Sequence, residues 1–199
     1  NGVNVTGGFL RLANTGTIQT TGGTAGAGLA GVRLASVLTV QNQTITNSGT
    51  INGGSDATHG YGIDVEDGIA VITNQSGGLI TGGTGAIRLA NTNASTVTLN
   101  SGSTVMGDIL STNTGTRTLT VAGLLSGNYV GGSGTGVVSF TLASTGSMQA
   151  ATFGSASDTF TFNGGTIGGV VNAGGGTDTF NSVLGAGNSA TVSLSNLTG

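Results

Sequence analysis

Acidic side chains gather around a single histidine in one stretch of the sequence. Asp56, His59, Asp64, Glu66 and Asp67 lie close together along the chain. Carboxylates at this spacing could bind Ca²⁺, or act as the acid and base of polysaccharide cleavage. Either site requires carboxylates that converge in space, which spacing along the chain does not establish. We therefore interpret the cluster as a solvated loop beside a ladder of charged residues, with the two sites as alternatives.

The histidine does not complete a recognisable catalytic or metal site. His59 is the sole histidine and the chain has no cysteine, so a zinc site is not expected. The sequence cannot pair this histidine with any one of the many serines and threonines as base and nucleophile. Among aromatic residues, which line polysaccharide-cleaving sites, Tyr61 alone is close to the acidic cluster. We predict that the chain is not an enzyme, and keep a polysaccharide-degrading enzyme as an alternative.

A second acidic pattern lies nearer the end of the chain. Segments 154–160 and 174–180 each contain an aspartate, Asp158 and Asp178, followed by Thr-Phe. They partly match the Ca²⁺-binding repeat G-G-x-G-x-D-x-U-x, but the first glycine is replaced in both and the copies do not follow one another in tandem. We expect the two aspartates to cap turns, with Ca²⁺ binding there as the alternative. No other cofactor is expected.

Three arginines and an aspartate share one local pattern. Arg11, Arg33, Asp64 and Arg88 are each flanked by aliphatic residues on both sides. Alternation along a strand would point all four outward, one coil apart in a stacked structure. Asp64 would then lie between Arg33 and Arg88 and pair across strands. As an exposed pair this contact is worth ~0–1 kcal/mol, and it would help to set the register.

Asparagines recur two residues before a glycine. Asn14, Asn47, Asn100 and Asn163 all stand in this position. Asparagine tolerates the left-handed conformation and can hydrogen-bond its own backbone, so it suits a tight corner. We expect these four side chains to stack as a structural ladder. Asn74 does not fit the same spacing.

A repeated element, Asn-x-Gly-Thr-Ile, positions these residues. Close copies occupy 14–18, 47–51 and 163–167, and degenerate copies lie between them. The aliphatic residues that end the copies are Ile18, Ile51, Ile80, Val105, Leu125, Met148 and Ile167. Their spacing shrinks from 33 residues to about 20, which is typical of one coil of a three-strand solenoid with loops of variable length.

Two further short strands are predicted between successive copies. The second strand of each coil follows a glycine-rich turn, at 31–34, 62–65, 86–89, 128–130 and 169–171. The third alternates β-branched or aromatic residues, at 69–73, 96–99, 116–121, 137–142 and 158–162. No useful 3.6-residue periodicity occurs, so we expect an all-β protein.

Composition supports the same conclusion. The chain has 41 Gly among 199 residues, no Pro, and only 6% charged residues. Abundant β-branched residues with many glycines indicate strands joined by frequent turns. Four arginines without lysine disfavour a phosphate-tracking surface, so nucleic acid is not an expected partner. No apolar run is long enough for a membrane-spanning helix.

A solenoid is the architecture that lets such short strands bury their side chains. Coils stacked about 4.8 Å apart place Ile on Ile, and each buried aliphatic side chain contributes roughly 1.5–3 kcal/mol. We predict a right-handed, single-stranded parallel β-helix with three short strands and about 20–33 residues per coil, in seven to eight coils. It forms one continuous unit over residues 1–199, with longer loops in 1–100 and tighter coils in 100–199.

The repeats resemble those of autotransporter passenger domains and related β-helical adhesins of Gram-negative bacteria. The resemblance rests on the segment 47–54, on 158–167 and on its echo at 174–180. It implies secretion through a C-terminal outer-membrane barrel and display at the cell surface. The chain shows neither signal peptide nor barrel, so we expect a fragment of a larger protein. The repeats carry no family site residues that could be transferred.

The function expected from this resemblance is structural and adhesive. We predict an extracellular scaffold on a bacterial surface that mediates adhesion or self-association. Its partners would be other cells, surfaces or copies of itself, and it would meet the outer membrane only through a barrel absent from this chain. A subunit of a self-assembling extracellular filament is a further alternative, since open coil ends can add strands.

Overall fold

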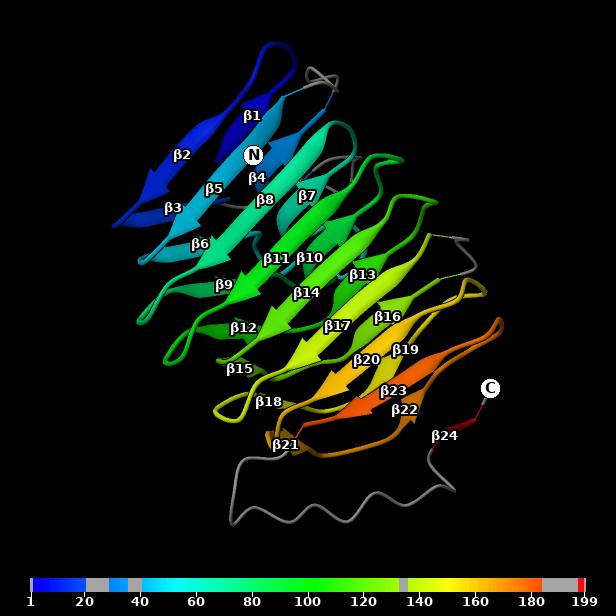
Figure 1. Cartoon of the computed structure of the whole chain (residues 1–199). Helices are drawn as coiled ribbons and strands as arrows, with labels where there is room; N and C mark the ends of the chain where they lie inside the picture. Colours follow the sequence, from blue (N-terminus) through cyan, green and yellow to red (C-terminus); the bar gives the residue numbers. More distant parts are fainter. Residues whose placement is uncertain (1, 21–28, 36–40, 133–135, 184–196, 199) are drawn as a thin grey trace.

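A computed structural model (Figure 1) describes residues 2–20, 29–35, 41–132, 136–183 and 197–198. Over these residues the protein is an all-β solenoid without a helix, in which every paired strand runs parallel to its neighbours in the next coils. Each coil contributes one strand to each of three sheets, which we call sheets A, B and C. The all-β fold with three strands per coil is therefore confirmed.

The three sheets are built from strands of two to six residues. Sheet A contains β1 (Val3–Val5), β4 (Ala30–Leu34), β7 (Tyr61–Val65), β10 (Gly85–Leu89), β13 (Ile109–Ser111), β16 (Tyr129–Gly131), β19 (Ala151–Thr152), β22 (Val171–Asn172) and β24 (Leu197–Thr198). Sheet B contains β2 (Arg11–Asn14), β5 (Asn42–Asn47), β8 (Ile69–Asn74), β11 (Ser95–Leu99), β14 (Arg117–Val121), β17 (Val138–Leu142), β20 (Thr159–Phe162) and β23 (Thr179–Ser182). Sheet C contains β3 (Thr17–Gln19), β6 (Thr50–Asn52), β9 (Leu79–Thr81), β12 (Thr104–Met106), β15 (Leu124–Leu125), β18 (Ser147–Met148) and β21 (Thr166–Ile167).

The aliphatic ends of the repeated element form one continuous row inside sheet C. Ile18 pairs with Ile51, and the pairing continues residue by residue along the sheet to Ile167. The five central members of the row are buried. Coil length falls from 33 residues between Asn14 and Asn47 to 20 between Asp158 and Asp178, as the repeat spacing predicts.

Sheet B supplies the other long row of the core. Its inward side chains change from aliphatic in the first coils to aromatic in the later ones. Phe140 and Phe160 lie with ring centroids 5.7 Å apart, and Phe160 stacks on Phe180 at the same distance. Tyr129 from sheet A packs against Phe140, also at 5.7 Å. Like residues thus stack on like residues, which lets a narrow interior reach close packing.

The predicted asparagine ladder exists, but with different members. Asn14 donates to Asn47 Oδ1 at 2.8 Å, and Asn47 donates to Asn74 Oδ1 at 2.9 Å. Placing Asn100 and Asn163 in the ladder was wrong. Leu99, not Asn100, pairs with Asn74. A shift of one residue along a strand turns the side chain to the other face, so the buried row continues with Leu99 instead.

The two displaced asparagines make different contacts. Asn100 donates from Nδ2 to Gln75 Oε1 at 2.7 Å, one coil away. The backbone N–H of Asn163 donates to Leu142 O, and its Oδ1 is buried without a hydrogen-bond partner. Neither side chain contributes to the ladder. The turns themselves use glycine as expected, since Gly77 and Gly102 both have φ of +79° at equivalent corners.

Candidate functional site

The charged residues of the early coils meet on the outer face of sheet A. Register pairs Asp64 of β7 with Arg33 of β4 on one side and with Arg88 of β10 on the other. Arg11 does not belong to this row, and placing it there was wrong. It lies on β2 of sheet B, opposite Thr44, because the strand that directly precedes an Asn-x-Gly-Thr-Ile element always enters sheet B.

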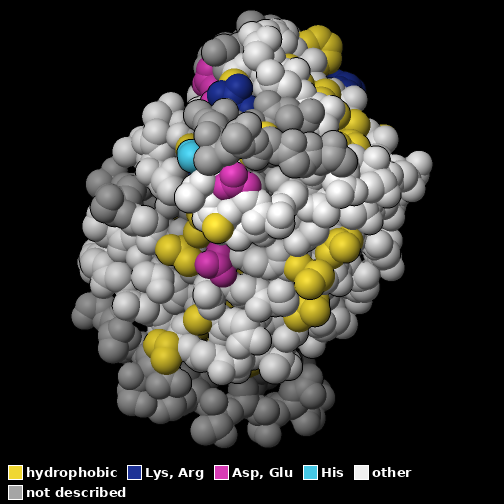
Figure 2. Space-filling model, turned by 180° about the vertical axis from the view of Figure 1, so that it is seen from behind, with side chains coloured by type: hydrophobic (Ala, Val, Ile, Leu, Met, Phe, Trp, Pro, Cys, Tyr) yellow, Lys and Arg dark blue, Asp and Glu magenta, His cyan; other side chains and the backbone are white. Residues whose placement is uncertain are grey.

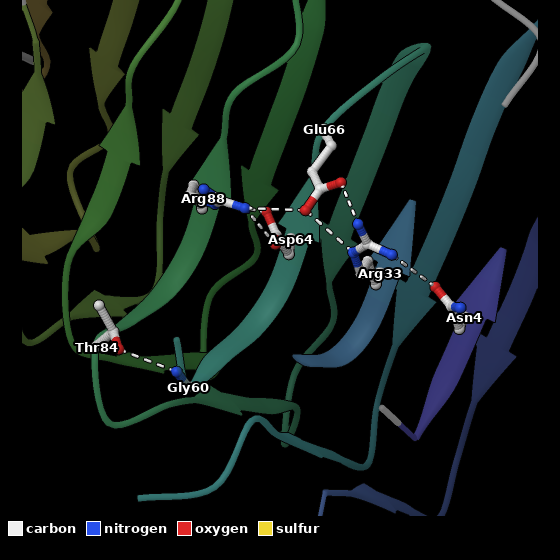
Figure 3. A network of polar contacts seen from close by, with 7 residues as sticks. All are labelled: Asn4, Arg33, Gly60, Asp64, Glu66, Thr84 and Arg88. Atoms are coloured by element: carbon white, nitrogen blue, oxygen red, sulfur yellow. Dashed lines mark hydrogen bonds and ion pairs between the residues drawn. The ribbon is translucent and has the colours of Figure 1, made fainter. Parts of the chain in front are cut away.

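Glu66 links the two arginines of this row (Figure 3). Arg88 binds Asp64 through Nε at 2.7 Å and Nη2 at 2.6 Å. Arg33 binds the two oxygens of Glu66, at 3.0 and 2.5 Å, and Arg88 Nη2 reaches Glu66 Oε1 at 3.1 Å. The expected pairing of Asp64 with both arginines is therefore corrected, since Arg33 takes Glu66 as its partner.

Burial distinguishes this cluster from an ordinary surface ion pair. The side chain of Asp64 is 1% exposed, whereas those of Arg33, Glu66 and Arg88 are 25–27% exposed. The sequence-based expectation of an exposed pair was wrong for Asp64. Burial raises the pKa of Asp64 above its usual value, even though the hydrogen bonds and charge of Arg88 act in the opposite direction. The same hydrogen bonds raise the pKa of Arg88.

An aromatic ring packs against the arginine that binds this carboxylate. The guanidinium of Arg88 lies 4.8 Å from the centroid of the Tyr61 ring, a cation–π arrangement. Desolvation raises the pKa of Tyr61. Arg88 is therefore held by two carboxylates and one ring at the same time. Two carboxylates compensate the charge of Arg88, which weakens its attraction for an anionic ligand.

The remaining members of the acidic stretch do not join this cluster. Asp56 Oδ1 accepts from the backbone N–H groups of Thr58 and His59 at 2.7 and 2.9 Å, and from the Thr58 hydroxyl at 2.7 Å. These hydrogen bonds lower the pKa of Asp56. Asp67 accepts from the N–H of Gly68 at 2.7 Å. Both carboxylates thus stabilise local turns.

The Asp56 loop is attached to the next coil and borders a groove. The hydroxyl of Thr84 accepts from Gly60 N at 3.0 Å and donates to Asp56 O at 2.9 Å. The groove has a volume of about 570 Å³, and its described lining includes Thr20, Asn52, Asp56 and the glycines of the sheet C corners. Four of its eleven described lining residues are glycines, and Asp56 is the one charged residue among them.

Asp158 and Asp178 lie one above the other in adjacent coils. Asp158 Oδ1 accepts from Val138 N at 2.7 Å, and Asp178 Oδ1 accepts from Asp158 N at 2.8 Å. Both line a cavity of about 410 Å³ that is otherwise mainly apolar, with Phe160 and Phe180 in its wall. Burial raises the pKa of Asp158, whose Oδ2 is buried and unpartnered. Each aspartate therefore caps the backbone of the preceding coil.

Every carboxylate in the sequence has a protein partner. The chain has seven Asp and Glu residues, and the one not yet mentioned, Asp108, accepts from Asn128 N at 2.8 Å. Within the part of the chain that the structure describes, no three His, Cys, Asp or Glu side chains form a group that could hold a metal ion. The charged side chains seen from behind in Figure 2 lie mostly over the N-terminal coils.

Arg117 is a buried cation that sequence reasoning missed. It is fully buried in β14 and donates to Asn91 O at 2.7 Å, Asn93 O at 2.8 Å and Ser111 Oγ at 3.0 Å. Burial lowers its pKa. A signal was present, because Arg117 lies two residues before the buried Leu119 and so faces inward by strand alternation. The guanidinium ties together backbone carbonyls at the corner between sheets A and B.

Comparisons with protein-family models, with curated proteins and with solved structures give no match to this chain. Among the described residues, no helix has the length and hydropathy needed to cross a bilayer. The solenoid and its contacts are therefore the basis on which a function is proposed.

Proposed function

We propose that the chain is an extracellular, non-enzymatic β-solenoid scaffold, of the passenger type displayed on bacterial surfaces, that mediates adhesion or self-association. The observation that carries the proposal is that the carboxylates are all used in structural hydrogen bonds. Each of the seven carboxylates accepts a hydrogen bond from the protein, and three of the four arginines, Arg33, Arg88 and Arg117, donate hydrogen bonds to protein groups. A glycoside hydrolase with two catalytic carboxylates would need such a pair free to face its substrate.

The outer surface supports a role in many weak contacts. The outward positions of sheet B are mostly Thr, and those of sheet C include Thr17, Thr50 and Thr104. Short hydroxyl side chains repeated from coil to coil can make the same contact many times. Repeated weak contacts give high avidity without a deep binding site. A stiff stack of coils also holds such contacts at a distance from its attachment point.

Surface display tests this proposal. The chain would be placed between a signal peptide and an autotransporter barrel in a non-adherent Gram-negative host, with an unrelated soluble domain as the matched passenger. Protease accessibility on intact cells measures display, and settling and retention on glass and on cell monolayers measure adhesion. We expect display with increased settling or retention. Efficient display with the behaviour of the control passenger would refute the adhesive role.

A self-assembling filament is the second candidate. In each sheet the outermost described strands have a hydrogen-bonded neighbour on one side only, as β2 and β23 do in sheet B. Unpaired strand edges are templates for pairing with another chain. Sedimentation at rising concentration separates the two candidates: growth into long species favours the filament, and a monomer at all concentrations argues against it.

A further inference from the structure

The outer face of sheet B carries two parallel rows of hydroxyl side chains, which we call the hydroxyl face. The first row follows the register Thr44, Val71, Thr96, Thr118, Ser139, Thr159, Thr179. The second row follows the register Thr46, Thr73, Thr98, Thr120, Thr141, Thr161, Asn181. Threonine thus occupies six successive rungs of the second row, and the strands that carry both rows form the front layer of Figure 1.

Strand geometry makes this face a two-dimensional lattice. Neighbouring strands lie about 4.8 Å apart, and residues two apart on one strand are separated by about 6.7 Å. Between the two rows, each strand points a buried side chain inward, such as Val97, Leu119 or Phe140, which holds the strand in place. Because threonine is branched at Cβ, its χ1 is restricted, so methyl and hydroxyl groups repeat with little disorder. Val71 keeps the same shape without the hydroxyl.

The hydroxyls of this face are available to water. All members of the two rows are half-buried or exposed, and within the described residues no hydroxyl of either row hydrogen-bonds another protein group. The face carries no charge from β5 to β23, since Arg117, on β14, points into the core. These groups are therefore free to bind an ordered array of water molecules.

The other two sheets lack such a lattice. The outward row of sheet A holds Arg33, Asp64 and Arg88, and then changes to the aliphatic Leu110. The outward row of sheet C is interrupted by Leu79 and Leu124. From Thr44 and Thr46 to Thr159 and Thr161 the two rows carry only methyl and hydroxyl groups, and such a surface repeating in two directions is specific to sheet B.

We propose that the hydroxyl face binds crystalline ice. The prism face of hexagonal ice repeats its oxygen atoms in two perpendicular directions, at spacings close to those between and along these strands. Hydroxyls at these spacings can hydrogen-bond ice-like water, while the methyls between them order the water that bridges to the crystal. The hydroxyl face is uncharged and periodic, as is the surface of an ice crystal, so the two can match without burying a charge. Stacking on a sugar polymer would need outward aromatic rings, and on sheet B the aromatic side chains point inward.

The test is ice-affinity partition of the purified, fluorescently labelled chain, with thermal hysteresis measured on the same sample. The test variant is Thr98→Tyr with Thr120→Tyr, in the middle of the second row. The matched control is Thr104→Tyr, an outward threonine of sheet C. Circular dichroism and melting temperature establish that each variant folds. The inference is independent of surface display, so failure of the display experiment leaves this test intact.

We expect the chain and the Thr104→Tyr variant to enter slowly growing ice and to shape its crystals, and the double variant to be excluded from ice like an ordinary soluble protein. Exclusion of the unmodified chain would overturn the inference, even if the double variant did not fold. Equal incorporation of all three folded proteins would also overturn it, because another surface would then be responsible. A dimer that dissociates in the double variant, without ice binding, would assign the face to a second copy of the chain.

Discussion

Asp64 and Arg88 face each other on neighbouring coils, joined by two hydrogen bonds of 2.7 and 2.6 Å, with the Asp64 side chain only 1% exposed. A carboxylate buried to this extent depends on its partner. Removing one member of a buried pair leaves an uncompensated charge, which costs far more than the loss of an exposed ion pair. The pair therefore locks the register of β7 against β10.

The variant Arg88→Met should lower the free energy of unfolding by about 3 kcal/mol at neutral pH, since Asp64 is left buried and ionised. Urea unfolding measures the change. The control is Arg11→Met, which removes an exposed arginine of sheet B and should change stability by less than about 0.5 kcal/mol. Because burial raises the pKa of Asp64, its protonated form is favoured in the folded state, so the loss should shrink as the pH falls through that pKa. A loss that grows at low pH would contradict this account.

The asparagine ladder gives a second prediction. Asn47 is fully buried and bonds both Asn14 and Asn74. Asn47→Ala should destabilise the protein by about 3 kcal/mol, because it leaves buried polar groups on two coils unsatisfied. Asn100→Ala, outside the ladder, is the matched control and should cost about 1 kcal/mol or less. Equal losses of stability in the two variants would show that the hydrogen bonds of the ladder contribute no more to folding than the contact of Asn100.

Tyr129 predicts a loss of stability in alkali. Burial raises its pKa to about 12. In the unfolded chain the tyrosine ionises near pH 10. Its contribution to the free energy of unfolding is therefore complete below about pH 10 and is lost as the pH rises through 12. The total loss of stability over this range is roughly 3 kcal/mol. Unfolding free energies across this range, with tyrosinate absorbance, measure the effect. Tyr129→Phe should remove this part of the slope, and an unchanged slope would assign it to other groups.

Arg117 provides a fourth prediction. Its guanidinium satisfies the carbonyls of Asn91 and Asn93 inside the solenoid. Arg117→Met should lower the melting temperature and cost about 3 kcal/mol, since buried carbonyls lose their donor although the aliphatic part of the side chain is kept. Arg11→Met again serves as the exposed control. A more stable Arg117→Met protein would show that desolvation of the cation outweighs its hydrogen bonds.

Much of the fold could be predicted because its signals are local. The aliphatic ends of the repeat, from Ile18 to Ile167, mark sheet C correctly, and the predicted second and third strands lie in sheets A and B, except that of 169–171 only Val171 is in a strand. Strands such as β13 and β19 were missed, because two or three residues carry too little alternation to be recognised. The candidate site was predicted less well, since Arg11 shares the local pattern of Arg33 but belongs to another sheet.

The sequence by itself determined the three-strand coil, its stacking and its shortening repeat, because side-chain alternation and glycine turns depend on a few neighbouring residues. The tertiary structure alone decided that Arg33 pairs with Glu66, that Asn74 replaces Asn100 in the ladder, and that Asp64 is buried. Those outcomes depend on the register between coils whose loops differ in length. A shift of one residue in that register moves a side chain to the opposite face of its sheet.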